Sequence, residues 1–143
     1  MLYAVIDIGS HSVRLMLTDG KAVEKKINTT RLVENVADGG YIQHENLENT
    51  AKAVADFHTL AKKKGAFKIF IFATEAVRSA KNGNDLISRI WELCGATVNV
   101  LDKSEEAEIG FLGDYKKGTC CVVDVGGGST EISVGNSTNI IYS

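Results

Sequence analysis

The chain carries a short internal repeat near its two ends. The segments YAVIDIGSHSVRLML, from residue 3, and CCVVDVGGGSTEISV, from residue 120, both read as an apolar strand, an Asp-x-Gly turn and a second strand. In both copies the first strand runs into an aspartate, Asp7 or Asp124. A repeat of this kind indicates a duplicated domain. We therefore expect a first domain over residues 1–118 and the start of a second, truncated domain of the same type over residues 119–143.

Between the two copies, apolar residues recur with helical or strand spacing. From Leu47 to Ala61 they recur at three- and four-residue steps, which is one face of a helix. A second helix, around residues 86–91, is stopped by Gly95. A third is expected to begin with Ser104 as its cap and to run towards residue 113. The chain is thus of the α/β class, with strands expected over residues 2–6, 12–18, 23–32, 67–73, 97–101, 119–123, 130–134 and 139–142.

The two Asp-x-Gly turns have the composition of phosphate-binding loops. Glycine lets the backbone approach a ligand closely, so that successive amides converge on phosphate oxygens. The aspartate is useful there only if Mg²⁺ lies between it and the phosphate. The first turn alone, Asp7-Gly9-Ser10, favours a structural turn over a phosphate-binding loop. The second turn, with Gly126, Gly127 and Gly128 followed by Ser129, favours phosphate binding. Three consecutive glycines make a loop entropically costly to order, and no purpose other than ligand binding is evident for them.

Several charged residues have two readings when the sequence is taken alone. Glu105 and Glu106 stand in the first turn of a predicted helix, where acids complement the helix dipole. Arg14 and Arg78 are of a type most often found at the surface, and Glu131 fits a solvated strand face as well as a ligand. Composition alone favours the structural reading for the glutamates and the arginines over a catalytic one, and leaves Glu131 even.

Bulk composition narrows the classes of partner. A net charge of −2 does not favour general nucleic-acid binding, and no apolar run approaches the length that crosses a bilayer. The three cysteines argue for a reducing compartment, so we expect a cytoplasmic protein without membrane or nucleic-acid partners.

Four segments in order resemble the exopolyphosphatase/guanosine pentaphosphate phosphohydrolase family of the actin/Hsp70/sugar-kinase superfamily. AVIDIGSHSVRLML is similar to the first phosphate motif of that family, and VVDVGGGSTEISVG to its second. ATEAVRSAKNG resembles its alanine–threonine–x–x–x–arginine segment, and SEEAEIGFLG its glutamate loop. The arginine segment followed by the glutamate loop separates this family from other superfamily members.

The resemblance implies a ribonuclease H-like (actin-like ATPase) domain, with a mixed five-stranded sheet flanked by helices, plus the first strands of a second similar domain. It implies hydrolysis of terminal phosphoanhydride bonds of polyphosphate or guanosine pentaphosphate. Mg²⁺, with room for a monovalent cation such as K⁺, and a homodimer of the full-length form are implied as well. By position, Glu106 would activate water and Arg78 would face the transferred phosphoryl group. The remaining roles would be metal binding by Asp124 and Glu131 and phosphate binding by Asp7, Gly9, Ser10, Gly126, Gly127, Gly128 and Ser129.

The chain departs from the family pattern at several positions. His11 stands where asparagine is usual, and Glu75 where a small neutral residue is common. Lys103-Ser104 replaces the usual lead into the glutamates, and Val33-Glu34 interrupts a segment that normally carries glycine. Glu75, if it points inward, would add negative charge beside a phosphate.

Two other functions remain open at this level. A kinase of the same superfamily would transfer phosphate from ATP to a small acceptor, but would leave Glu106 without a role. A non-catalytic module would use the same loops to bind phosphate or a nucleotide without turnover.

Overall fold

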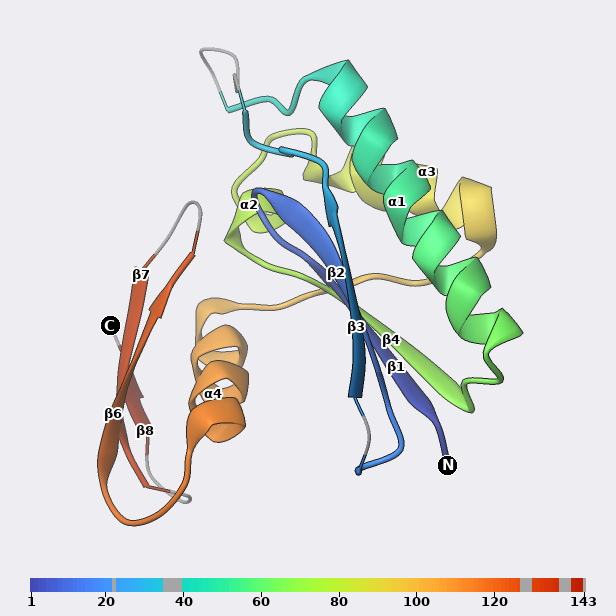
Figure 1. Cartoon of the computed structure of the whole chain (residues 1–143). Helices are drawn as coiled ribbons and strands as arrows, with labels where there is room; N and C mark the ends of the chain where they lie inside the picture. The colour runs from blue at the N-terminus through green and yellow to red at the C-terminus, as the bar shows by residue number, and fades with distance from the viewer. Residues whose placement is uncertain (22, 35–39, 127–129, 137–139, 143) are drawn as a thin grey trace.

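The larger of two sheets is mixed and five-stranded. It holds β1 (Tyr3–Ile8), β2 (Ser12–Thr18), β3 (Val23–Thr29), β4 (Lys68–Ala73) and β5 (Asn99–Val100), in the order β3-β2-β1-β4-β5. The first three strands pair antiparallel, as expected, and β1, β4 and β5 run parallel. The computed structural model describes residues 1–21, 23–34, 40–126, 130–136 and 140–142 (Figure 1).

Two long helices lie together on one face of this sheet. They are α1 (His44–Lys63) and α3 (Gly83–Cys94), and α1 contacts β1, β2 and α3 (Figure 1). Ile6, Leu15 and Val54 are fully or almost fully excluded from solvent in the core between sheet and helices. Gly95 ends α3 in the left-handed conformation at φ 67°, as the sequence predicted. Among the described residues, no helix combines the length and the apolar character that a membrane crossing needs.

The smaller sheet is antiparallel and three-stranded. Its strands are β6 (Cys120–Val125), β7 (Thr130–Gly135) and β8 (Ile140–Tyr142), in sequence order. Helix α4 (Lys103–Asp114) contacts all three strands and lies on the side of this sheet that faces the larger one (Figure 1). The domain boundary after residue 118 stays a prediction; α4 precedes it in the chain and yet packs on the second sheet.

The internal repeat is preserved in the strand register. The offset of 117 residues that carries Asp7 to Asp124 also carries the pair Asp7–Arg14 to Asp124–Glu131 in the β1–β2 and β6–β7 ladders. The same offset carries the β2–β3 pairs to those of β7 and β8, for instance Leu17–Glu24 to Val134–Ile141. Matching registers place equivalent side chains on equivalent faces, because side chains alternate along a strand.

One face of the smaller sheet is open where its counterpart in the first copy is covered. Ile6 and Leu15 are directly paired and buried in the α1-covered core. Their equivalents, Val123 and Ile132, are also paired but 57% and 46% exposed. The two copies therefore share strands and register, but only the first has this face covered by a helix of the described chain, because α4 packs on the opposite face of the second sheet.

The sequence missed one short helix. Helix α2 (Glu75–Arg78) spans only four residues directly after β4, which is too short to show helical periodicity. The strand expected over residues 97–101 is reduced to the two residues of β5, and β3 ends at Thr29 rather than at residue 32. These shifts are ordinary for element ends, where hydrogen bonding is shared with loops.

Candidate active site

The parallel strands bring two of the predicted motifs to one edge of the larger sheet. Strands β1 and β4 run parallel and in register, with Asp7 opposite Phe72 near their carboxyl ends. The first Asp-x-Gly loop follows β1, and α2 with Arg78 follows β4 almost at once. Ligands in α/β folds bind beyond the carboxyl ends of parallel strands, so this edge is the expected place for a site.

The first loop is held in a tight turn by backbone bonds. The Gly9 amide donates to the Ser12 carbonyl at 3.1 Å, and the His11 carbonyl accepts from Arg31 N–H at 2.9 Å. A Cβ on Gly9 would lie 3.3 Å from the same Ser12 oxygen, closer than most real contacts, so glycine suits this turn. The Ser10 carbonyl also accepts, from Val33 N–H at 3.2 Å. Since the Gly9 amide is already used, phosphate contacts at this loop would have to come from its other groups.

Arg78 and Glu106, the two predicted catalytic residues, are in direct contact. Arg78 Nη1 donates to Glu106 Oε2 at 3.0 Å and to the Leu101 carbonyl, and Nη2 donates to Glu75 Oε2. The side chains of Arg78 and Glu106 are 22% and 18% exposed. Neither residue is therefore the freely solvated surface group that its residue type alone suggested.

The start of α4 separates the roles of the two adjacent glutamates. Asp102, rather than the expected Ser104, is the N-cap: its Oδ1 accepts from the amides of Ser104 and Glu105 at 2.8 and 2.9 Å. Glu105 Oε2 turns back to accept from the Asp102 amide at 2.9 Å, which completes a capping box. Glu105 thus stabilises the helix end, whereas Glu106 reaches Arg78.

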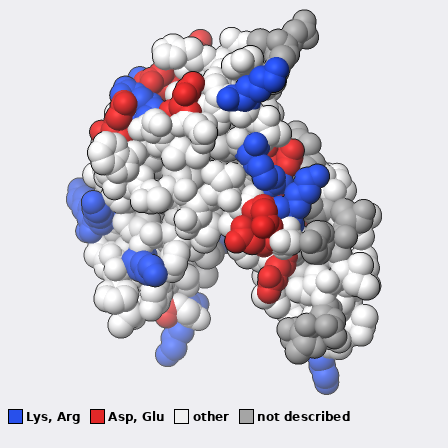
Figure 2. Space-filling view, turned by 180° about the vertical axis from the view of Figure 1, so that it is seen from behind, with Lys and Arg blue, Asp and Glu red and all other residues white. Residues whose placement is uncertain are grey.

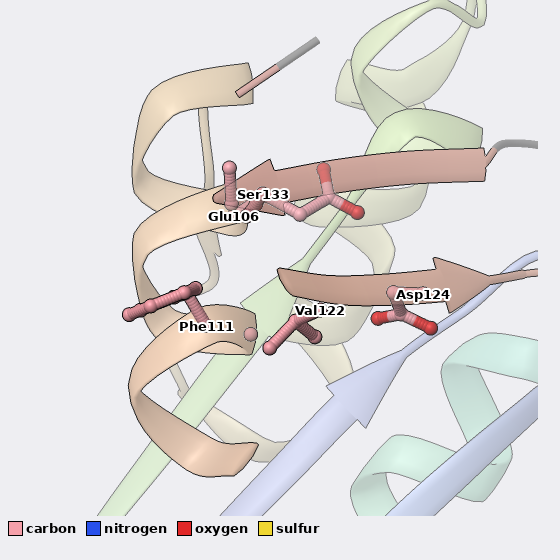
Figure 3. A pocket seen from close by; sticks show the side chains of 7 residues that line it. Glu106, Phe111, Val122, Asp124 and Ser133 are labelled. Carbon is pink, nitrogen blue, oxygen red and sulfur yellow. The ribbon is translucent and has the colours of Figure 1, made fainter. Parts of the chain in front are cut away.

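A small pocket lies between α4 and the second sheet. Phe111 closes one end, and the carboxylates of Glu106 and Asp124 extend at the other (Figure 3). Gly110 lies beside Asp124, since a Cβ there would make an ordinary van der Waals contact with Asp124 Oδ2 at 3.9 Å. The space-filling view from behind shows a notch between the two parts of the molecule, with acidic and basic side chains gathered beside it (Figure 2). The pocket is lined by Glu106, Ala107, Gly110, Phe111, Val122, Asp124 and Ser133.

Asp7 is affected by the charge of Asp124, the equivalent acid of the second repeat. Burial raises the pKa of the Asp7 carboxyl; the charge of Arg14 partly opposes this, and the charge of Asp124 adds to it. A carboxylate that is partly buried and faces another carboxylate is stabilised by a cation. Among the described residues, no group of three or more acidic, histidine or cysteine side chains lies together in a way that could hold a metal ion. Two carboxylates nevertheless suit Mg²⁺, because proteins usually bind this ion through one or two carboxylates, with waters and substrate phosphates as the other ligands.

Replacing Asp7 by asparagine should stabilise the protein against urea at pH 7 in the absence of divalent metal. The wild type then carries an ionised carboxylate in a place that raises its pKa, whereas asparagine carries no charge. The gain should shrink as pH falls through the raised pKa of Asp7 and be absent below about 3, where aspartate is protonated in both folded and unfolded chains. Asp56→Asn, on the exposed side of α1, is the matched control. A difference that is independent of pH, or of opposite sign, would contradict this account.

Several predicted site residues lie partly or wholly outside the described structure. Gly127, Gly128 and Ser129 fall outside the described residues. Glu131 is described only by its backbone, which places it directly opposite Asp124 in the β6–β7 ladder. Gly126 follows β6 and is exposed.

Sequence reasoning missed the residues that shape the pocket. Gly110 and Phe111 come from the α4 turn that follows Glu106, and the four-residue step from Glu106 to Gly110 was a readable signal of a shared helix face. Val122 and Ser133 come from the second sheet, and no local pattern links them to α4. The Leu101 carbonyl that binds Arg78 had no signal at all, since any residue supplies a carbonyl.

The fold and the site define an actin-like ATPase-fold domain with an arginine–carboxylate cluster at the sheet edge. The sequence matches the Ppx/GppA phosphatase family model over residues 5–143, so the chain belongs to this family.

Relatives in several bacteria cover the same region. The chain is 33% identical to "Uncharacterized protein SCO0757" of Streptomyces coelicolor and 30% to Exopolyphosphatase 1 of Mycobacterium leprae, over 94% of this chain and 43% of either relative. It is 29% identical to the guanosine-5'-triphosphate,3'-diphosphate pyrophosphatase of Pseudoalteromonas atlantica, over 99% of this chain and 30% of that protein. The chain thus spans less than half the length of these curated relatives.

Two solved structures share the fold of this chain. The Aquifex aeolicus PPX-GPPA enzyme superposes with a TM-score of 0.85 at 32% identity, over 99% of this chain and 52% of that one. An exopolyphosphatase from Cytophaga hutchinsonii superposes with a TM-score of 0.89 at 25% identity, over 100% of this chain and 49% of that one. The expected fold class is confirmed by these neighbours and by the five-stranded mixed sheet.

Proposed function

We propose that this protein hydrolyses terminal phosphoanhydride bonds of inorganic polyphosphate or guanosine pentaphosphate, with Mg²⁺ and with Glu106 as the base. The contact between Glu106 and Arg78, beside the pocket that also holds Asp124, carries the proposal. It joins the general base and the cation that phosphoryl transfer needs, although they come from α4 and α2, 28 residues apart.

The proposed reaction is an in-line attack of water on the terminal phosphorus. A water oxygen attacks the terminal phosphorus in line, and its proton passes to Glu106. The bond from that phosphorus to the bridging oxygen breaks, which yields orthophosphate and a substrate shorter by one phosphate. Negative charge spreads over the equatorial oxygens in a loose transition state, where the Arg78 guanidinium would oppose it. Burial alone would lower the pKa of Arg78, but its hydrogen bonds to Glu106 and Glu75 outweigh burial and raise it, so the group stays cationic.

A divalent cation would be held by the acids of the two repeats. Asp7 and Asp124 would supply carboxylate oxygens, and Glu131 lies opposite Asp124 in the ladder. When bound, Mg²⁺ would polarise phosphate oxygens and neutralise their charge. A monovalent cation such as K⁺ would be a further, separate requirement.

Substrate and assembly are inferred from the relatives and from the resemblance. The relatives' names include both an exopolyphosphatase and a guanosine pentaphosphate pyrophosphatase, which supports both substrates. The free thiols of Cys94, Cys120 and Cys121 support a reducing compartment such as the cytoplasm. A homodimer of the full-length form rests on the family resemblance alone.

The direct test is phosphate release from long-chain polyphosphate and from guanosine pentaphosphate, in the longest natural form of the protein. We expect release with Mg²⁺ and its loss in excess EDTA, recovered on adding Mg²⁺ back. A parallel assay with ATP and small hydroxyl acceptors addresses the kinase alternative. Phosphate transfer that requires an acceptor, or tight polyphosphate binding without any release, would replace the hydrolase proposal with one of its two rivals.

A further inference from the structure

Both terminal nitrogens of Arg78 are occupied by carboxylates. Nη2 donates to Glu75, and Nη1 donates to Glu106 and to the Leu101 carbonyl. A guanidinium recognises a phosphoryl group best with two parallel N–H donors. Nη2 belongs to both edges of the guanidinium that offer such a pair, so a phosphate bound in this way competes with Glu75 for that nitrogen.

Glu75 is the partner that yields more readily. Its side chain is 33% exposed, against 18% for Glu106, so water more easily replaces its contact with Arg78. Nη1 is bound from two separate segments, by Glu106 on α4 and by the carbonyl of Leu101, whereas Nη2 meets Glu75 from the same short helix. Release of Nη2 leaves the link between Arg78 and α4 in place.

We propose that Glu75 is a positioning residue that latches Arg78 and is displaced from Nη2 by the terminal phosphoryl group of the substrate. This rests on the proposed function, in which Arg78 receives that group. Before substrate binds, the contact between Glu75 and Arg78, here called the latch, holds the guanidinium against Glu106. During binding, Glu75 competes with phosphate and repels it, since like charges close together are unfavourable. Glu75 therefore tunes substrate affinity and favours multiply charged chain ends over weaker anions.

Glu75→Gln keeps the size of the side chain and removes its charge. We expect Arg78 to react about threefold or more faster with phenylglyoxal, which modifies guanidinium groups, as followed by peptide mass spectrometry. We also expect the concentration of Mg²⁺–tripolyphosphate that half-protects Arg78 from labelling to fall about three- to tenfold, since part of an ion pair no longer has to be broken. The KM for polyphosphate should fall similarly, with kcat changed less than about twofold, and Glu75→Asp should restore wild-type behaviour in part.

Arg89 on α3 offers a matched control. Arg89 also holds two carboxylates, those of Glu48 and Glu92, at 2.7 and 2.9 Å. Glu92→Gln should speed the labelling of Arg89 and leave both the labelling of Arg78 and its protection by tripolyphosphate unchanged.

Protection of Arg78 by tripolyphosphate and release of phosphate are measured separately, so the latch and the hydrolase activity can fail independently. Protection at lower tripolyphosphate in Glu75→Gln, without phosphate release from any form, would support the latch and overturn the hydrolase proposal. Hydrolysis that depends on Arg78, with half-protection unchanged or at higher tripolyphosphate in Glu75→Gln, would overturn the latch and leave the hydrolase. An Arg78 that is labelled equally fast in both forms would also overturn the latch.

Discussion

Glu106→Gln should lower phosphate release from polyphosphate by about a hundredfold to ten-thousandfold, the usual contribution of a general base. Glutamine keeps the shape of the side chain and can still accept the hydrogen bond from Arg78 Nη1, so the fold and the cluster should persist. What it loses is the ability to take the proton of the attacking water. The measurement is the steady-state rate of orthophosphate release with Mg²⁺, with the folded state checked by circular dichroism.

Glu105→Gln is the control for this substitution. Glu105 lies next in the chain but turns back to the Asp102 amide, and glutamine retains an oxygen for that hydrogen bond. We expect activity within about twofold of wild type for Glu105→Gln, because no step of the proposed chemistry uses this side chain. Equal rates for wild type and Glu106→Gln would remove Glu106 as the base, and with it the proposed mechanism.

Gly83→Ala should be the most damaging small substitution in the part of the chain that forms the larger sheet and its helices. Gly83 is buried at the start of α3, and an added Cβ would overlap the carbonyl oxygen of Val77 and come within 3.3 Å of its side chain. Backbone on both sides must then move, which should cost about 3 kcal/mol of unfolding free energy. Val77 immediately precedes Arg78, so hydrolysis should fall as well. Urea unfolding and phosphate release would measure the two effects.

Gly113→Ala provides the opposite expectation within the same protein. Gly113 is an exposed residue of α4, and nothing lies within 4 Å of the position of its added Cβ. Alanine in a helix should raise stability by about 0.5–1 kcal/mol relative to glycine. If Gly83→Ala were as stable as wild type, the close packing of α3 against α2 would be wrong.

Local patterns predicted most of the fold because local interactions set them. The helical spacing that begins at Leu47 gave α1 within a few residues, and Gly95 ended α3 where a left-handed residue was needed. The α4 cap was predicted at the wrong residue, since Asp102 and Ser104 are both N-cap residue types and only the hydrogen bonds show which one accepts. Helix α2 was missed because four residues cannot display a period.

The site was only partly predictable from the chain. The motifs singled out Arg78 and Glu106, and their contact in the structure agrees with a shared site, while their catalytic roles remain predictions. Sequence alone indicated that Glu75 would repel a phosphate if it pointed inward, and the structure shows in addition that it pairs with Arg78. Charge signs alone could not show this, because pairing depends on side-chain direction.

The sequence by itself determined the repeat, the order of the strands and the three longer helices, and the acids near the ends of β1 and β6, because periodicity and turn chemistry depend on neighbouring residues. Tertiary structure alone decided that Glu106 meets Arg78, that Asp124 acts on Asp7, and that α4 packs on the second sheet. These contacts join segments tens of residues apart. Strand register and helix packing, which no local pattern encodes, determine which of the many compatible surfaces meet.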